Sequence, residues 1–206
     1  MKFERFICGP LENNVFLVFC EKTKNGAIID PALGSSTALF LAKELGLKIK
    51  WVLNTHGHPD HTIEDAFAIK ETGARLAIHR LDEYRLSQNS KIVTPYLSAK
   101  QEPVAADKTF TDGEKIAFGT VKLKAIHTPG HTEGSSCFFE EKTKTLFSGD
   151  TLFKNTYGRT DFEGGNAEQM KQSLKKIYAM LPKKTLVLPG HGEFTTIGAE
   201  KWIEKL

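Results

Sequence analysis

The 206-residue chain lacks the features that define several broad classes of protein. No apolar run approaches the ~18 residues of a membrane-spanning helix. The N-terminal stretch MKFERFICGP places charges inside its short apolar run, so we expect no signal peptide and a cytoplasmic protein. The net charge is only +3, far from the basic excess of nucleic-acid-binding proteins. We therefore expect no nucleic acid and no membrane among its partners.

Cysteine is also scarce, and its spacing excludes a disulfide framework. Cys8, Cys20 and Cys137 are widely separated and contain no C-x-x-C pair, which predicts buried free thiols in a reducing compartment. Hydrophobic residues are 40% and charged residues 26% of the chain, as in an ordinary globular protein. No linker or low-complexity segment is visible. We expect one domain over residues 1–206, with a polar loop at 87–103.

Short β-rich runs alternate with helical patterns along the chain. We expect strands at residues 14–20, 26–30, 48–55, 121–128, 135–141, 145–150 and 185–190. We expect helices at residues 35–46 (capped by serines), 61–73 and 167–181. Such alternation is typical of the α/β class. A weak internal repeat, in which Asp30 and Asp150 each end a strand that precedes a helix and another strand, favours two similar halves.

The most unusual feature is a group of histidines in THGHPDH, residues 55–61. Imidazoles are poor core fillers, so packing does not explain their crowding, whereas a metal site does. Residues two apart on an extended chain point the same way, so His56 and His58 can reach one ion. Asp60 and His61 open the next helix and can face a second ion. Nitrogen and carboxylate ligands suit zinc, and also iron or manganese.

Four of the expected strands are each followed by a potential metal ligand. These residues are His56, His131, Asp150 and His191. Because ligands bind at the carboxyl ends of strands in open α/β sheets, we expect one shared metal site there. The remaining histidines serve as a contrast. We expect His127 to support the loop before His131, and His79 to lie at the surface or at a helix start.

Together these motifs resemble the metallo-β-lactamase superfamily. Its signature is H-x-H-x-D-H, then a His in a TPGHT-like turn, a GD at a strand end and a late GH. Here these read THGHPDH, HTPGHTEGS, FSGDTLF and LPGHG. The resemblance implies an αββα sandwich of two pseudo-symmetric halves and two divalent metal ions, with zinc expected. It assigns one ion to His56, His58 and His131, the other to Asp60, His61 and His191, and the bridge between them to Asp150.

Within the superfamily, the chain is most similar to the short, single-domain glyoxalase II-like hydrolases. The stretches that carry the resemblance are GPLENNVFLV, GDTLFKNTYGRTDFEGG and GHGEFTTIGAEK. It implies hydrolysis of thioesters such as S-lactoylglutathione by a hydroxide that two closely spaced metal ions generate at neutral pH. Asp60 and Asp150 are the expected catalytic residues. Arg159 matches a residue that contacts a glutathione carboxylate in the full-length enzymes, and Phe162 matches the aromatic residue that follows it.

Two departures from the full-length glyoxalase II pattern bear on the substrate. Only 15 residues follow His191, so we expect the C-terminal helical domain that holds much of the glutathione to be absent. Phe162 also lacks a phenolic hydroxyl. A more open site of this kind can accept another thioester, so the acyl group and the thiol carrier stay open.

Several alternatives share the same motifs. Persulfide dioxygenases of the superfamily also carry the GRTDF stretch, and use one iron at positions matching His56, His131 and Asp150, but their N-terminal segment differs. A lactonase or another hydrolase of the superfamily would share the metals. A β-lactam hydrolase is disfavoured because we expect no export signal, and a nucleic-acid phosphodiesterase because no basic face is visible. A metal-binding scaffold without activity is disfavoured because all seven ligand positions are intact. The oligomeric state stays open.

Overall fold

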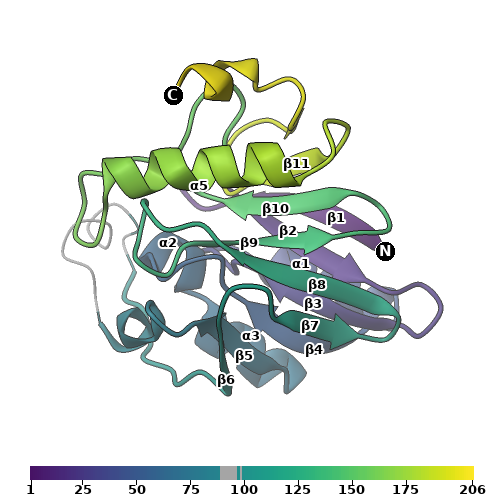
Figure 1. The fold of residues 1–206 in the computed structure, drawn as a ribbon. Coiled ribbons are helices and arrows are strands. Elements are labelled where there is room, and N and C mark those ends of the chain that lie inside the picture. The colour runs from purple at the N-terminus through teal and green to yellow at the C-terminus, as the bar shows by residue number, and fades with distance from the viewer. Residues whose placement is uncertain (89–96, 98) are drawn as a thin grey trace.

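The computed structural model describes residues 1–88, 97 and 99–206. In it, two sheets lie face to face (Figure 1). The first contains β1 (Lys2–Cys8), β2 (Asn13–Phe19), β3 (Asn25–Ile29), β4 (Lys48–Leu53), β5 (Arg75–His79) and β6 (Lys108–Phe110). The second contains β7 (Lys115–Phe118), β8 (Val121–His127), β9 (Ser136–Glu140), β10 (Thr145–Gly149), β11 (Leu186–Pro189) and β12 (Thr195–Thr196).

Helices cover the outer faces of both sheets. They are α1 (Ser36–Glu44), α2 (Pro59–Thr62), α3 (Asp65–Thr72) and α5 (Ala167–Met180), with 3₁₀ turns at Glu83–Ser87 and Lys201–Lys205. In Figure 1, α5 lies along β10 and β11, whereas α1 and α3 lie on the opposite side of the molecule. This arrangement confirms the αββα sandwich, and β2, β3, β4, β8, β9, β10 and β11 confirm the expected strands.

The layers follow from the apolar character of the central strands. All seven residues of β2 are buried, as expected for a strand covered on both faces. Phe16 and Val18 face the core between the sheets, and Val15 and Leu17 face the helices, as the two-residue period of a strand requires. On the other side, α5 buries Met170, Leu174 and Ile177 against the second sheet, which confirms the predicted helical stripe.

The two halves repeat one unit, as predicted. Strand β3 is followed by Asp30, α1 and the parallel strand β4, and β10 is followed by Asp150, α5 and the parallel strand β11. Both sheets are mixed, with strand orders β1–β2–β3–β4–β5–β6 and β12–β11–β10–β9–β8–β7. Each parallel pair delivers its carboxyl ends to the same edge, and that edge carries the expected ligands.

Two details of the helices differ from expectation. The single helix expected over 61–73 is broken at Glu64, whose backbone N–H donates to the Pro31 carbonyl and whose carboxylate accepts the N–H groups of Gly34 and Ser35. These contacts with another loop outweigh the local helical preference. The expected serine cap is also wrong, because the Ser35 hydroxyl donates to Glu64 and accepts no hydrogen bond from the first turn of α1.

Three further expectations concern the cysteines, the polar loop and the absence of membrane-spanning helices. Cys8, Cys20 and Cys137 are buried free thiols, as predicted, and burial raises the pKa of the Cys137 thiol to about 11. The polar loop at 87–103 falls largely outside the described residues. Within the described parts of the chain, no helix has the length and apolar character to cross a membrane.

Candidate metal centre

The expected ligands converge at one edge of the sandwich. His56 follows β4, His131 follows β8, Asp150 follows β10 and His191 follows β11. His58 occupies the N-cap of α2 with an extended backbone, which Pro59 favours at the preceding position, and Asp60 and His61 lie in the first turn of that helix. Of these seven side chains, all except those of Asp150 and His191 belong to fully buried residues.

The first set of potential ligands consists of three buried imidazoles, those of His56, His58 and His131. One ring nitrogen from each lies within 4.8 Å of the other two. The His58 Nδ1 and His131 Nε2 atoms are 2.8 Å apart. Among the described residues, the buried Nε2 of His56 has no hydrogen-bond partner. A buried polar atom without a partner is costly, and a metal ion at this point would satisfy it.

The second set combines a carboxylate with two imidazoles, and consists of Asp60, His61 and His191. The Nε2 atoms of the two histidines are 3.2 Å apart. The Oδ2 atom of Asp60 is 3.3 Å from the Nε2 of His61 and 3.4 Å from the Nε2 of His191. The structure therefore brings together the residues that the sequence assigned to a second ion.

Asp150 lies between the two sets. Its Oδ1 is 3.5 Å from the Nε2 of His61, and its Oδ2 is 3.5 Å from the Nε2 of His131 and 3.7 Å from that of His191. In the described part of the chain, the buried Oδ1 accepts no hydrogen bond. This is the place that a bridging carboxylate requires.

The hydrogen bonds around the histidines show that this donor set fits metal ions. Carbonyl or carboxylate oxygens accept the Nδ1–H of three rings: Asp30 Oδ2 for His61 at 3.0 Å, Arg159 O for His131 at 2.7 Å and Leu11 O for His191 at 2.9 Å. The His56 Nδ1 is 3.1 Å from the Thr55 hydroxyl, which itself donates to Asp30. Because these partners hold a proton on Nδ1, the Nε2 lone pairs face the centre, as in metal-ligating histidines.

The two sets differ in their electrostatics. Burial and the neighbouring imidazoles lower the pKa of His56 and of His58 well below the ordinary value. Burial acts in the same direction on His61, but the carboxylates of Asp60 and Asp150 outweigh it and raise the pKa of that imidazole well above its ordinary value. Burial lowers and carboxylates raise the pKa of His191, again with a net increase. His56 and His58 are therefore held neutral, whereas the nearby carboxylates favour the charged form of His61 and His191.

The sequence analysis missed the residues that anchor the ligands. Asp30, which it used only as a repeat marker, accepts the N–H and hydroxyl of Thr55 as well as the His61 ring. Asp30 could also be counted as a ligand with His56 and His61. We favour an anchoring role, because both of its oxygens already accept hydrogen bonds. Asn13, also missed, donates its amide to Asp60 Oδ2 at 2.9 Å.

The two expected substrate residues lie beside the first set. The Phe162 ring is 6.1 Å from the His58 ring, and the Arg159 guanidinium carbon is 3.6 Å above the Phe162 ring centre. The Arg159 guanidinium also donates two hydrogen bonds of 2.8 Å to Asp161, a partner that the sequence analysis did not foresee. This guanidinium beside Asp161 lowers the pKa of the carboxyl to about 2. Their role in substrate binding stays a prediction.

The other two histidines form a stacked pair away from the cluster. The rings of His79 and His127 are 4.1 Å apart and nearly parallel, with an interplanar angle of 11°. The His127 Nε2 is 2.8 Å from the Glu133 carbonyl, so this residue does support the loop that carries His131. The surface position expected for His79 is wrong, because it ends β5, a strand that the sequence analysis missed, and is only 2% exposed.

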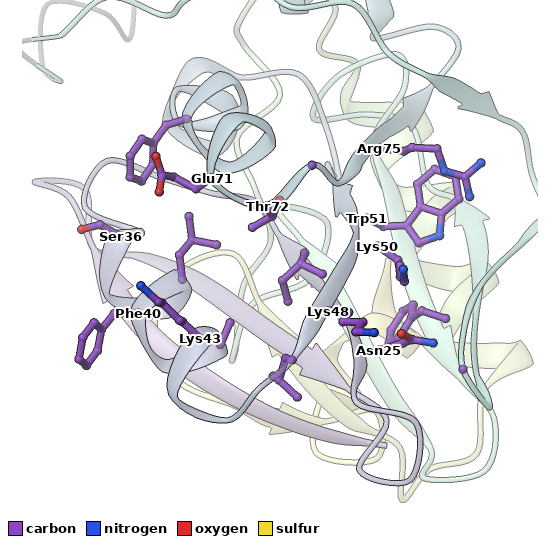
Figure 2. A pocket seen from close by; sticks show the side chains of 18 of the residues that line it. Asn25, Ser36, Phe40, Lys43, Lys48, Lys50, Trp51, Glu71, Thr72 and Arg75 are labelled. Carbon is purple, nitrogen blue, oxygen red and sulfur yellow. The ribbon is translucent and has the colours of Figure 1, made fainter.

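A groove of about 1180 Å³ lies away from this centre. Figure 2 shows Phe40 and Lys43 of α1 on one side of it, and Lys48, Trp51 and Arg75 of β4 and β5 on the other. Lys48 and Arg75 are the first residues of β4 and β5, whereas the expected metal ligands follow the carboxyl ends of the strands. The groove is therefore separate from the histidine cluster.

Comparison with known proteins agrees with the fold and the motifs. The Metallo-beta-lactamase superfamily matches residues 8–191, and the chain belongs to this superfamily. Among its relatives are two proteins named hydroxyacylglutathione hydrolase. GloC of Haemophilus influenzae is 32% identical over 98% of this chain and 95% of its own length, and that of Rhodospirillum rubrum is 37% identical over 89% of this chain and 63% of its own. The protein is thus a hydrolase of the metallo-β-lactamase superfamily.

Several solved structures with different names share the fold of this chain. The BLEG-1 B3 metallo-beta-lactamase has a TM-score of 0.90 and 29% identity, covering 97% of this chain and 96% of its own. A di-iron-bound protein has a TM-score of 0.84 and 29% identity, covering 96% of each chain. ETHE1 from Myxococcus xanthus has a TM-score of 0.80 and 27% identity, covering 98% of this chain and 82% of its own. The superfamily and the His/Asp cluster support a site for divalent metal ions in this chain.

Proposed function

We propose that this protein hydrolyses thioesters, with S-acyl-glutathione compounds such as S-lactoylglutathione as the substrate class, using two zinc ions. One observation carries the proposal. The potential ligand atoms of Asp60, His61 and His191 lie within 4.8 Å of one another, and this second set adjoins the first. Keeping these ionisable groups together in a largely buried site is costly unless a cation balances them. Two relatives named hydroxyacylglutathione hydrolase support the choice of substrate.

Water cleaves the acyl C–S bond. The acid gains the hydroxyl group of water, and the thiol keeps the sulfur and gains the remaining proton. Metal ions held by the two sets would lower the pKa of water and polarise the thioester carbonyl. The chain supplies oriented ligands, since the Nδ1 hydrogen bonds of His61, His131 and His191 fix their rings. The Asn13 amide orients Asp60, whose carboxylate is the candidate to accept a proton during the reaction.

The substrate side of the site is formed by the segment after Asp150. Arg159 is the candidate to bind a carboxylate of the thiol carrier, because a guanidinium fork matches carboxylate geometry. Its present partner, Asp161, is exposed, and solvent weakens such a pair, so a substrate carboxylate can replace it. Phe162 provides an apolar surface between this arginine and the His58 ring.

The second candidate is a persulfide dioxygenase with a single iron at His56, His131 and Asp150. The GRTDF stretch and the structural similarity to ETHE1 support it. It requires no second ion, so the two functions make different demands on His191, whose Nε2 lies beside Asp60, His61 and Asp150.

The test is turnover of S-lactoylglutathione by zinc-loaded protein, followed by detection of the free thiol. We expect saturable turnover that is lost on chelation, restored by zinc and strongly reduced in His191→Ala. The matched control is Asp107→Asn, which alters a carboxylate that accepts the Leu76 N–H far from the cluster. Absence of thioester turnover in protein that retains its metals, together with oxygen consumption by iron-loaded protein with glutathione persulfide, would establish the dioxygenase instead.

A further inference from the structure

A buried carboxylate outside the ligand sets joins the two loops that carry the first set. Asp82 is completely buried, at the start of the 3₁₀ turn Glu83–Ser87. Its Oδ2 accepts the backbone N–H of Gly57 at 2.8 Å and the hydroxyl of Thr132 at 2.6 Å. Its Oδ1 accepts the backbone N–H of Gly134 at 2.7 Å. Gly57 lies between His56 and His58, whereas the other two donors flank Glu133 in the His131 loop.

A neighbouring arginine extends these contacts to the segment beside the first set. The Arg85 Nε is 3.6 Å from Asp82 Oδ1. Its Nη2 donates to the Glu133 carboxylate at 2.6 Å and to the carbonyl of Glu163 at 3.0 Å. Glu163 directly follows Phe162, so one side chain contacts the His131 loop and the segment expected to bind substrate. Arg85 is itself mostly covered, with 11% of its side chain exposed.

The loops approach this pair so closely that only glycine fits at three positions. A Cβ at Gly57 would lie 2.7 Å from the Arg85 Cβ, and one at Gly134 would lie 2.6 Å from the Asp82 Cγ. A Cβ at Gly164, whose φ is +82°, would lie 2.4 Å from the Arg85 Nη2. Direct contact on three sides means that a displacement of the pair displaces the loops as well.

We propose that Asp82 and Arg85 are positioning residues that hold His56, His58 and His131 in ligand geometry and fix the 159–164 segment against them. A carboxylate that accepts three hydrogen bonds from two loops ties those loops together, and charge-assisted bonds are the strongest available for this purpose. The inference depends on the metal-binding role of the first set. It holds whether the substrate is a thioester or a persulfide.

The two residues have separable effects. Asp82→Asn keeps the shape but replaces one acceptor oxygen by an NH₂ group, which would face the backbone N–H of Gly57 or of Gly134 and could not accept from it. We expect the zinc affinity of the first set to fall ~10–100-fold, as for other residues that orient metal ligands. Arg85→Met keeps the aliphatic stem and loses the contacts with Glu133 and Glu163. We expect it to raise KM with a smaller change in zinc affinity.

The decisive measurement is zinc affinity by chelator competition in two backgrounds. The His191→Ala background leaves the first set intact. In it, Asp82→Asn should lower the zinc affinity by the full ~10–100-fold. In His58→Ala the second set is left intact, and Asp82→Asn should change its affinity by less than ~3-fold, as for distant sites. Asp107→Asn, the control, should change neither. Because no turnover is measured, a failure of the proposed function leaves this result intact.

Two outcomes would overturn the proposal. Equal zinc affinity with and without Asp82→Asn in the His191→Ala background would show that the carboxylate does not position the first set. Equal losses in both backgrounds would indicate a general destabilisation instead. If Asp82→Asn fails to fold, Thr132→Val removes one of the three donors and is tested in the same two backgrounds. Amide hydrogen exchange of Gly57 and Gly134 in metal-free protein should quicken in either variant and stay unchanged in Asp107→Asn.

Discussion

The two ligand sets lie side by side but are built on different physical principles. The first contains imidazoles alone, and burial keeps those of His56 and His58 neutral because it lowers their pKa. The second contains a carboxylate, and there the pKa of His61 and of His191 is raised. One set thus offers nitrogen ligands alone, whereas in the other set carboxylates draw positive charge, either protons on the imidazoles or a metal ion.

The sets also differ in enclosure and in what anchors them. The residues of the first set are at most 5% exposed, and the contacts to Asp82 join its two loops. In the second, the His191 side chain is 25% exposed and its Nδ1 bonds a carbonyl of the loop between β1 and β2. The two sets therefore have largely separate supports, so that each set can be altered with little change to the other.

The largest effect is expected from removing Asp150, the carboxylate that lies between the two sets. Asp150→Ala deletes the oxygens that face His61 on one side and His131 on the other. We expect loss of at least one zinc ion per chain and a fall in thioester hydrolysis of ~10³-fold, because metal ions stabilise the transition state by several kcal/mol and each 1.36 kcal/mol is tenfold. Metal analysis and thiol release test this. Normal turnover in the variant would rule out a bridging role.

Much of this architecture could be predicted from the sequence because it rests on local patterns. The two-residue period of β2 and the helical stripe of α5 follow directly from the spacing of apolar residues. The convergence of the seven expected ligands could be predicted because each follows a strand or opens a helix, and because the motifs of THGHPDH and LPGHG resemble a known superfamily. The sheets then bring these strand ends together, as expected for parallel pairs.

The supporting residues could not be predicted, because their partners are distant along the chain. Asp82 lies 25 residues from Gly57 and 52 from Gly134, and nothing in RLDEYRL indicates that its carboxylate bonds either. Asp30 stands 31 residues before His61. The strand β5 was missed because RLAIH is short, begins with Arg75 and is followed by Arg80, and the burial of His79 was missed with it. Such contacts depend on tertiary packing.

Arg159 allows a smaller change, because its backbone and its side chain have different expected roles. The backbone carbonyl of Arg159 holds the His131 ring, whereas its side chain stacks on Phe162. Arg159→Ala keeps the carbonyl and removes the guanidinium. We therefore expect zinc content to stay unchanged and KM for glutathione thioesters to rise ~10-fold, the value of about one charged hydrogen bond. Steady-state kinetics with matched metal analysis test this, and an unchanged KM would remove Arg159 from the substrate site.

Asp161→Asn is the matched control for this prediction. It weakens the pair that occupies the Arg159 guanidinium and leaves the arginine itself in place. If the arginine binds a substrate carboxylate, the variant should show a KM that is equal to or lower than that of the unaltered protein. A rise in KM comparable to that of Arg159→Ala would instead mean that the pair acts as a structural unit.

The smallest expected effect concerns His79 of the stacked pair, which is buried like the first set but lies outside the metal centre. Burial, followed by the charge of His127, lowers the pKa of His79 from 6.5 to about 4. Below pH 6.5 the unfolded chain therefore binds a proton that the folded chain does not take up until about pH 4, so stability falls as the pH falls through this window. We expect metal-free protein to lose ~1–3 kcal/mol more than His79→Phe between pH 7 and pH ~4.5. Urea unfolding measures both, and the ligand histidines, common to both proteins, cancel in the difference. If the free energy of unfolding falls equally with pH in both proteins, His79 is protonated in the folded protein over this pH range. Burial alone would then not keep a histidine of this sandwich neutral.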